Sequence, residues 1–320
     1  MATAPNPLLA TYLVTGGAGF IGSHLVEALL HTGARVRVLD NVSTGRLNNL
    51  QAVSGAIEWL AGDVCDAGDV AKAVQGCDVV FHQAAIASVP RSVEEPLATH
   101  AACATATLNV LDQARRAGVR RVVYAASSSA YGNQPQPQKS EGDLPSPLSP
   151  YAAAKLAGEH YCQAFWHSYG FETVALRYFN VFGPRQDPSG PYAAVIPLFI
   201  QAILKGQQPT IFGDGLQTRD FTYVENVVQA NLLAAAAPGA AGRMFNVASG
   251  TAISLLDLLR ELNANCGTNI QAMFQPSRAG DVRDSLADIS QARTVLGYEP
   301  TIGFEEGLRR TVDFYKTAGA

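Results

Sequence analysis

Short apolar runs rich in β-branched residues alternate with helix-like stretches from the N-terminal region to about Asn180. The apolar runs occupy residues 12–15, 35–39, 57–60, 78–82, 121–126 and 173–178. After the first run, Ile21, Leu25 and Leu29 recur at the spacing of an amphipathic helix. Strands that alternate with helices form right-handed crossovers and a parallel sheet. The pattern therefore predicts an α/β fold built on a doubly wound parallel sheet.

The alternation loosens beyond Asn180 and suggests a second lobe. Helical spacing reappears at Val195–Lys205 and at Asn226–Ala237, and turn-rich FGDGLQTRD lies between them. An apolar run at 245–247 predicts a strand that returns to the main sheet. We expect a main domain of residues 1–183 plus about 223–250. A smaller, discontinuous C-terminal α/β substrate lobe would hold about 184–222 and 251–320.

Composition excludes several classes of function. The net charge is −4, and no Lys or Arg run offers the basic surface that nucleic acids need. No window reaches the ~18 apolar residues of a membrane span, and no basic leader precedes an apolar stretch. We expect a cytoplasmic protein that binds neither membrane nor nucleic acid. The five cysteines show no CxxC spacing, which favours a reduced compartment and no metal site.

A glycine-rich segment follows the first predicted strand and opens the first helix. Gly16-Gly17-Ala18-Gly19-Phe20-Ile21-Gly22 satisfies both GxGxxG and GxxGxxG. Such glycines allow a tight turn, admit backbone N–H groups to a pyrophosphate and let helix and strand pack closely. A turn without ligand is the plainer alternative, but the strand–turn–helix context favours a Rossmann-type dinucleotide site. The expected contacts are Gly16, Gly19, Phe20, Ile21 and Gly22.

Acidic residues at the ends of the next two strands extend this site. Asp40 ends the second strand, where a carboxylate accepts hydrogen bonds from ribose hydroxyls and repels a 2′-phosphate. NAD should therefore be preferred over NADP, with Asn41 as a neighbouring contact. Asp63 and Val64 follow the third strand and could hold the adenine. Asp63 could equally be an ordinary helix cap.

Tyr151 and Lys155 form a candidate catalytic pair in SPYAAAK. Four residues apart, they lie on one helix face, where an ammonium would lower the pKa of the phenol and make Tyr151 a general base. A bare YxxxK arises often by chance, so the upstream glycine motif carries the interpretation. Ser127 ends a predicted strand and could relay the proton. Ser128 is expected to be structural or to contact substrate.

Six segments together resemble the UDP-sugar 4-epimerases of the extended short-chain dehydrogenase/reductase family over essentially the whole chain. They are TGGAGFIGSHL, FHQAA, AASSSAYG, SPYAAAK, RYFNVFGP and FGDGLQTRDFTYVENV. The resemblance implies that Tyr151 takes the proton of the sugar 4-hydroxyl while NAD takes a hydride from C4. The 4-keto sugar then rotates and is reduced on its other face.

The resemblance also implies individual contacts. Gln83, Ala84 and Ala85 of FHQAA would face the cofactor, and Lys155 and Tyr178 would hold its nicotinamide side. The implied nucleotide-sugar contacts are Asn180, Val195, Thr210, Arg219 and Arg278. The arginines suit a pyrophosphate, although Arg219 could instead pair with Asp220 and Arg278 could be a surface loop residue.

Two features bear on the reaction and the sugar. Dehydratases of this family carry an Asp-Glu pair after the catalytic hydroxyl, whereas Ser128 and Ser129 stand here, which favours epimerisation. Ser285 stands where galactose-restricted epimerases carry Tyr, and Ser88 could bond an acetamido group. Both features favour UDP-N-acetylglucosamine and its C4 epimer as substrates. UDP-glucose could also be a substrate. Ser285 could alternatively be a solvent-facing loop serine.

The chain departs from the family at three positions. Ala87 replaces a nicotinamide-contacting Lys of several epimerases, and Cys103 and Ala106 replace an Asn and a Gly. Two other functions stay open: a UDP-glucuronate 4-epimerase or decarboxylase, which would need a cation in its pocket, and a non-catalytic NAD-sensing module. A homodimer through helices within 99–117 and 153–169 is the family expectation.

Overall fold

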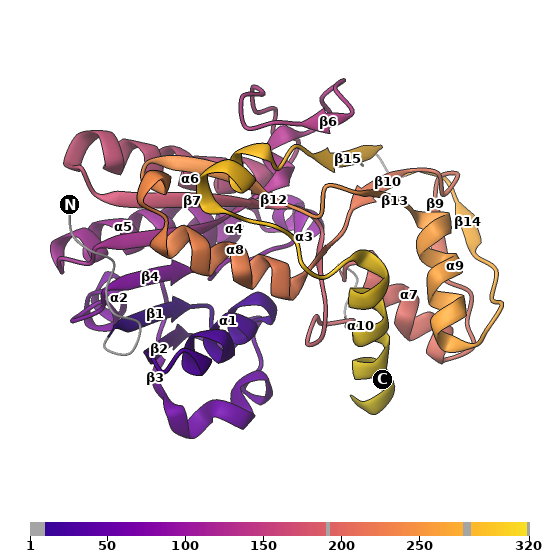
Figure 1. Cartoon of the computed structure of the whole chain (residues 1–320), viewed down its shortest axis with the longest axis horizontal. Helices are drawn as coiled ribbons and strands as arrows, with labels where there is room; N and C mark the ends of the chain where they lie inside the picture. The colour runs from indigo at the N-terminus through magenta and orange to yellow at the C-terminus, as the bar shows by residue number, and fades with distance from the viewer. Residues whose placement is uncertain (1–9, 190–192, 278–282, 319–320) are drawn as a thin grey trace.

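Seven parallel strands form the central sheet. The computed structural model describes residues 10–189, 193–277 and 283–318. The strands are β1 (Thr11–Thr15), β2 (Arg35–Asp40), β3 (Ile57–Ala61), β4 (Val79–His82), β5 (Arg121–Ser127), β7 (Glu172–Tyr178) and β12 (Arg243–Val247). Their order is β12-β7-β5-β4-β1-β2-β3, and Figure 1 shows β4, β1, β2 and β3 following one another across the sheet. The predicted strands and the doubly wound parallel sheet are confirmed. The order reverses between β1 and β4, which is where such sheets bind ligands.

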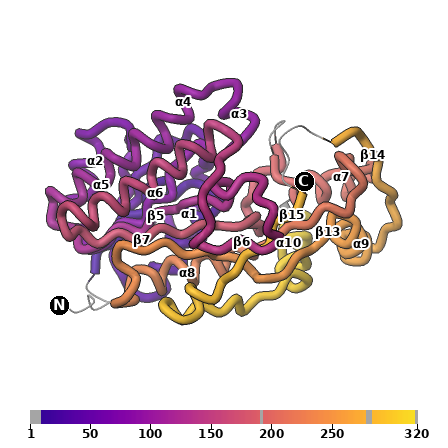
Figure 2. The backbone as a smooth tube through the Cα atoms, turned by 90° about the horizontal axis from the view of Figure 1, so that it is seen from above, coloured from indigo at the N-terminus to yellow at the C-terminus, as the bar shows by residue number. Residues whose placement is uncertain are grey.

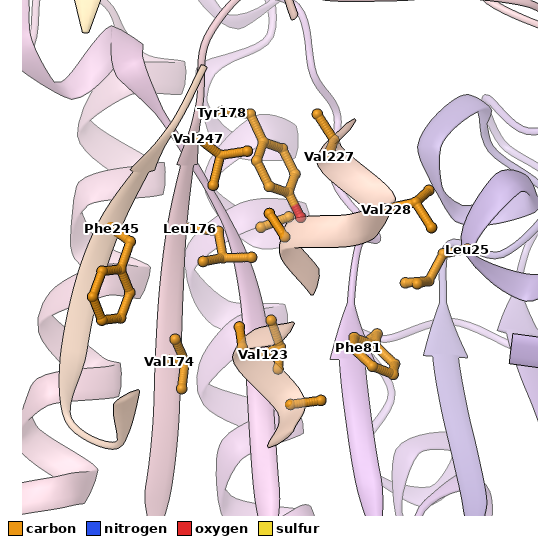
Figure 3. Packing of buried hydrophobic residues seen from close by; sticks show 14 of the residues in the cluster. Leu25, Phe81, Val123, Val174, Leu176, Tyr178, Val227, Val228, Phe245 and Val247 are labelled. Atoms are coloured by element: carbon orange, nitrogen blue, oxygen red, sulfur yellow. The ribbon is translucent and has the colours of Figure 1, made fainter. Parts of the chain in front are cut away.

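Helices cover both faces of this sheet. α1 (Phe20–His31) and α8 (Val224–Ala236) pack on one face, and α2 (Ala67–Ala73), α5 (Ala106–Arg116) and α6 (Pro150–Tyr169) pack on the other. Figure 3 shows how the first face is filled: Leu25, Val227 and Val228 of the helices meet Phe81, Val123, Val174, Leu176, Phe245 and Val247 of the strands. Each such buried side chain stabilises the fold by about 1.5–3 kcal/mol.

The connections add short helical turns. They are η1 (Leu47–Ala56), α3 (Val89–Glu94), α4 (Pro96–His100), the π-helical turn η2 (Ala101–Thr105), η3 (Ser128–Tyr131), η4 (Pro238–Ala240) and η5 (Ala292–Leu296). α3, α4 and η2 run from the end of β4 back along α6 to the start of α5. Among the described residues, no helix is both long enough and apolar enough to cross a membrane.

A second lobe lies beyond the carboxyl end of the sheet, as Figures 1 and 2 show. Its helices are α7 (Val195–Leu204), α9 (Leu255–Cys266) and α10 (Phe304–Ala318). Its strands are β9 (Thr210–Phe212), β10 (Thr218–Asp220), β13 (Ala252–Ser254), β14 (Met273–Gln275) and β15 (Asp284–Ala287). β8 (Val181–Phe182) pairs with β11 (Thr222–Tyr223) at the junction. The lobe has its own apolar core, which includes Phe199, Ile200, Leu258 and Leu308.

One strand of the lobe comes from the first half of the chain. β6 (Gln138–Lys139) pairs with β15, so the four-stranded sheet of the lobe has the order β13-β10-β15-β6. The sequence pattern places residue 138 within the main domain, because a two-residue strand leaves no periodic signal. The loop between β5 and α6 therefore links the two parts of the molecule.

Helix α6 begins and ends where its sequence dictates. Ser149 is the N-cap and accepts a hydrogen bond from the Ala152 N–H at 3.1 Å, and Pro150 occupies the first helical position. Gly170 ends the helix with φ +62°, a left-handed conformation that glycine adopts at little cost. The capped first turn fixes Tyr151 at the carboxyl edge of the sheet.

A buried ion pair holds α6 against strand β7. Arg177 donates to Glu159 through Nε at 3.0 Å and Nη2 at 2.8 Å, and the two side chains are only 2% and 4% exposed. The Arg177 guanidinium also lies 4.4 Å from the ring centroid of Tyr131, whose hydroxyl donates to Asn246 at 2.6 Å. The pair lies one helical turn beyond Lys155 and so stiffens the support of the candidate catalytic residues.

We expect Glu159→Ala to lower the free energy of unfolding by about 3–5 kcal/mol, because it leaves a buried guanidinium without its counter-charge. Urea unfolding followed by circular dichroism measures this loss. Asp313→Ala removes an exposed partner of Arg309 and should have a much smaller effect. Equal losses in the two variants would show that burial does not decide the cost.

Candidate active site

The glycine segment brings backbone against backbone. Gly16 has φ +69°, and its N–H donates to the Leu39 carbonyl at 2.9 Å, which bends the chain sharply after β1. A Cβ on Gly22 would lie 2.2 Å from the Gly16 carbonyl oxygen, so any side chain there would push α1 off the turn. The first turn of α1 consequently points its N–H groups at the edge of the sheet. That arrangement is a cradle for phosphate.

A cavity of about 590 Å³ extends from this cradle along the carboxyl edge of the sheet. It is lined by every residue predicted to contact the cofactor: Gly16, Gly19, Phe20, Ile21, Gly22, Asp40, Asn41, Asp63, Val64, Gln83, Ala84, Ala85, Tyr151, Lys155 and Tyr178. The volume is within the usual range for cofactor sites. The cavity has further walls that the motifs did not signal: Ser43, Thr44, Gly45, Arg91, Ala98 and Ala102.

The acidic side chains at this edge are held by backbone donors. Asp40, 8% exposed, accepts the Ala18 N–H at 2.9 Å and the Val42 N–H at 2.7 Å, which ties the end of β2 to the glycine segment. Val42 itself has φ +56°, an uncommon conformation for a β-branched residue. These bonds leave lone pairs on the Asp40 carboxylate for ribose hydroxyls.

Asp63 lines the cavity and is not a helix cap. Its carboxylate accepts the Cys65 N–H at 2.8 Å and the Asn41 side-chain amide at 3.0 Å, while Asp66 caps α2. The hydrogen bond from the Cys65 backbone is the main cause that lowers the pKa of Asp63. Asp63 is therefore charged at neutral pH and lines the same cavity as Asp40.

Tyr151 and Lys155 line the inner part of the cavity. Ser127 ends β5 and lies close enough to Tyr151 for its hydroxyl to lower the pKa of the phenol. The Lys155 ammonium donates to the Ala125 carbonyl at 2.7 Å and lies 5.0 Å from the ring centroid of Tyr124. The structure thus brings together the three residues that the sequence proposed for catalysis.

The expectation that Lys155 lowers the pKa of the Tyr151 phenol was wrong in direction. Burial raises the pKa of Tyr151 to about 12, the neighbouring Cys103 adds to the rise, and only the hydrogen bond with Ser127 opposes it. Burial also lowers the pKa of Lys155, whose ammonium is directed to a backbone carbonyl. Helix spacing brought the two residues to one face but could not reveal the desolvation of both groups.

The three adjacent serines form one turn. The Ser127 hydroxyl lies 2.8 Å from the Ser129 hydroxyl and accepts the Ser129 N–H at 3.2 Å. Ser128 begins η3 and is half-buried, and no carboxylate occupies this turn. Gly132 ends it with φ +61°, where a Cβ would meet the Ser146 carbonyl at 1.9 Å.

Sequence reasoning missed a buried histidine whose pKa is influenced by Lys155. His82 ends β4, with Nδ1 2.8 Å from the Thr15 hydroxyl and Nε2 3.1 Å from the Thr107 hydroxyl. Burial lowers the pKa of His82 to about 3, and the charge of Lys155 contributes, so the ring is neutral. The Thr107 hydroxyl donates to the Cys103 carbonyl, which fixes η2 beside Tyr151. A lone histidine in an apolar run gave no signal of this role.

A second cavity, of about 740 Å³, opens between the sheet and the lobe. Asn180, Val195, Thr210 and Arg219 all line it, as the resemblance implied for substrate contacts. Arg219 donates to the Thr218 carbonyl at 2.8 Å and to the Arg283 carbonyl at 3.0 Å. Asp220 accepts hydrogen bonds from Ser249 and Gly250. Arg278 lies outside the described residues.

The two serines expected to contact the sugar have different surroundings, and of the two only Ser88 lines a cavity. Ser285 lies in strand β15 opposite Arg219 and is half-buried, and Asn180 donates to its hydroxyl at 3.5 Å, so it is not a loop serine. Ser88 lines the first cavity and caps α3 by accepting the Arg91 N–H at 3.2 Å. The described residues contain no group of three His, Cys, Asp or Glu side chains that could hold a metal ion.

Comparisons with known proteins agree with this geometry. A model of the NAD dependent epimerase/dehydratase family matches residues 12–248. The chain is 40% identical to a UDP-glucose 4-epimerase of Mycolicibacterium smegmatis, over 95% of this chain and 98% of that protein. It is similar in structure to a UDP-N-acetylglucosamine 4-epimerase from Methanobrevibacter ruminantium in complex with UDP-N-acetylmuramic acid, with TM-score 0.92, 41% identity and coverage of 97% and 99%. A UDP-glucose 4-epimerase from Thermotoga maritima with UDP-glucose also has TM-score 0.92, at 36% identity and 97% and 100% coverage.

We expect Asp40→Asn to weaken NAD binding and to reduce the preference for NAD over NADP by about tenfold or more, because the charge that repels a 2′-phosphate is lost. Titration of both dinucleotides into each variant gives the ratio of dissociation constants. Asp63→Asn removes the other carboxylate of the cavity and should change the ratio less. A ratio unaffected by Asp40→Asn would remove this residue from cofactor selection.

Proposed function

The chain belongs to the NAD dependent epimerase/dehydratase family, and we propose that it inverts the C4 hydroxyl of a UDP-hexose. The preferred pair is UDP-N-acetylglucosamine and UDP-N-acetylgalactosamine, with UDP-glucose and UDP-galactose as possible further substrates. One observation carries the proposal: Tyr151 and Lys155 line the cofactor cavity with Ser127 close to the Tyr151 phenol, and the expected nucleotide-sugar contacts Asn180, Val195, Thr210 and Arg219 line a second cavity.

The cofactor cavity fits NAD. The glycine cradle suits the diphosphate, since a Cβ at Gly22 would close it, and Asp40 offers acceptors for a ribose diol. Gln83 and Asn231 hold the Tyr178 hydroxyl at 3.1 and 2.8 Å, so the wall beside Lys155 is stiff. When bound there, NAD would supply the acceptor and donor of a hydride, and the glycine cradle, Asp40 and Lys155 are the residues that would hold it.

Tyr151 is the proton acceptor of the proposed reaction. Its phenol requires stabilisation of the anion, because burial holds its pKa near 12. The Ser127 hydroxyl donates to the phenolate and shares the proton that leaves the sugar 4-hydroxyl. The same proton returns to the sugar oxygen after the 4-keto sugar has presented its other face. The net result is isomerisation, so neither proton nor hydride is consumed.

Water elimination is disfavoured by the chemistry of the serine turn. An elimination needs a carboxyl acid and a base beside the reacting carbons. Ser128 and Ser129 offer only hydroxyls, and the Ser129 hydroxyl is paired with Ser127. The turn can bond a sugar hydroxyl but cannot protonate a leaving group. Simple transfer between two faces of one carbon is the reaction that these residues support.

The choice of an acetamido sugar rests on small side chains near the junction of the cavities. Ser285 is half-buried, and its hydroxyl is within 3.5 Å of the Asn180 amide that lines the second cavity. A larger side chain on β15 at this position would reduce the space beside Asn180. Ser88 retains a hydroxyl proton for an acetamido oxygen, since its oxygen accepts from the backbone of α3. Similarity to the M. ruminantium enzyme supports the same choice.

The homodimer stays a prediction. α5 and α6 pack side by side, and α6 exposes Tyr161 by 37% and Tyr169 by 58%. The preceding helices α3 and α4 expose Val93 by 66% and Leu97 by 84%. Apolar groups of this kind are compatible with a helical interface.

The proposed reaction is tested by incubating the full chain separately with UDP-N-acetylglucosamine, UDP-glucose and UDP-glucuronate, and following the anomeric protons by NMR. Formation of UDP-N-acetylgalactosamine is the expected result. Turnover of UDP-glucose alone would keep C4 epimerisation and contradict the acetamido choice. Conversion of UDP-glucuronate alone would replace the proposal with uronate chemistry.

Tyr151→Phe should retain NAD and lower turnover by about 10²- to 10⁴-fold, because the ring stays but the proton acceptor is lost. Turnover is measured by NMR, and retained NAD by absorbance after denaturation. Tyr161→Phe, an exposed phenol on the same helix, is the matched control and should behave like the parent protein. Full activity of Tyr151→Phe would exclude Tyr151 as the base.

Ser285→Tyr should lower kcat/KM for UDP-N-acetylglucosamine by about 10- to 100-fold more than for UDP-glucose, because the phenol fills space beside the sugar. Ser285→Ala keeps the side chain small and should leave the ratio close to that of the parent. The ratio of the two kcat/KM values is the measured quantity. If Ser285→Tyr leaves it unchanged, Ser285 does not select the sugar.

A further inference from the structure

The charged side chains of the cofactor cavity are unevenly distributed. Asp40, which ends strand β2, and Asp63, which follows strand β3, contribute two carboxylates to its wall. Lys155, at the inner end, is 2% exposed and already donates to the Ala125 carbonyl. Among the described residues that line this cavity, Arg91 is the only other cationic side chain. Of these two cationic side chains, Arg91 is therefore the better placed to add positive charge to an anionic diphosphate.

Arg91 is held in place while keeping donors available. It lies in α3, where the Ser88 hydroxyl accepts its backbone N–H at 3.2 Å. Its Nε donates to Glu95 Oε2 at 3.0 Å, and the side chain is 34% exposed. Within the described part of the chain, the Nη groups make no other hydrogen bond or ion pair. A guanidinium fixed at one edge by a carboxylate presents its other edge in a defined direction.

The position of Arg91 favours the cofactor over the sugar nucleotide. It lines the first cavity together with Ala98 and Ala102, and the residues around the second cavity include Val89 but not Arg91. Val89 and Arg91 are two residues apart on a helix and therefore point in different directions. Arg91 therefore lies in the wall of the first cavity, on the helical segment that follows β4.

We propose that Arg91 is a phosphate-binding residue for the dinucleotide, with its Nη groups donating to the diphosphate while Glu95 orients the guanidinium. The glycine cradle and the N-terminus of α1 supply neutral N–H donors to the diphosphate. Arg91 adds full charge and a pair of donors in one plane, which suit phosphate oxygens. The proposal depends on NAD binding alone and not on which sugar nucleotide reacts.

The test uses the full chain freed of nucleotide and titrated calorimetrically with ADP-ribose and with adenosine. Arg91→Gln should weaken ADP-ribose binding by about tenfold, the usual effect of one charge-assisted hydrogen bond, and should leave adenosine binding unchanged. The dependence of ADP-ribose affinity on salt should also decrease. Equal weakening of adenosine and ADP-ribose would show that Arg91 only supports the pocket, which would overturn the proposal.

Two further variants separate charge at this site from charge in general. Arg91→Lys keeps the charge but loses the planar pair of donors, so it should bind ADP-ribose more weakly than the parent protein and more tightly than Arg91→Gln. Arg309→Gln removes an exposed arginine that also pairs with an acid four residues later, outside the cavity, and should bind as the parent does. If Arg91→Lys binds as weakly as Arg91→Gln, or Arg309→Gln weakens binding as much, charge at this site is not the cause and the proposal fails. Circular dichroism of each variant verifies that it is folded.

Discussion

The close approach of helix α1 to the turn after β1 is the contact on which the rest of the site depends. Only a hydrogen atom fits between Gly22 and the carbonyl oxygen of Gly16, where a Cβ would lie 2.2 Å from that oxygen. Because the helix packs directly on the turn, the Ala18 N–H donates to the carboxylate of Asp40. The register of β1 and β2 pairs Thr15 with Leu39, so the two strands end at the same edge of the sheet. The phosphate cradle and the ribose acceptor are thus two outcomes of one packing constraint.

Parallel pairing then gathers chemistry from distant parts of the chain. Thr15, His82, Ser127 and Tyr178 each end a strand of the same sheet, so their side chains or their immediate successors share one edge. α6 crosses behind that edge and adds Tyr151 and Lys155, while the ion pair between Glu159 and Arg177 locks the helix to β7. The burial that stabilises this arrangement also raises the pKa of the Tyr151 phenol.

The sequence predicted those parts of the molecule that depend on local pattern. Strand ends, the glycine turn and the capped helix bearing Tyr151 follow from spacing and residue type, and one cavity is lined by residues of the glycine turn, the end of β2 and this helix. Tertiary properties were missed. The direction of the Tyr151 pKa depends on burial, the neutral state of His82 depends on burial and on the charge of Lys155, and β6 is too short to show periodicity. The position of Arg91 in the cavity could not be read from the sequence, because the residues beside it in the cavity wall come from separate helices.

The pairing of β6 with β15 has a consequence for biosynthesis. Residues 138 and 139 leave the ribosome long before residues 286 and 287, their partners in the lobe sheet. β12 likewise completes the main sheet beside β7 only after most of the lobe segment before it has been made. Neither the main sheet nor the lobe sheet can therefore be completed until a strand from a later part of the chain has been synthesised. Nascent chains must carry an open sheet edge until late in synthesis, and such edges are where unfinished proteins aggregate.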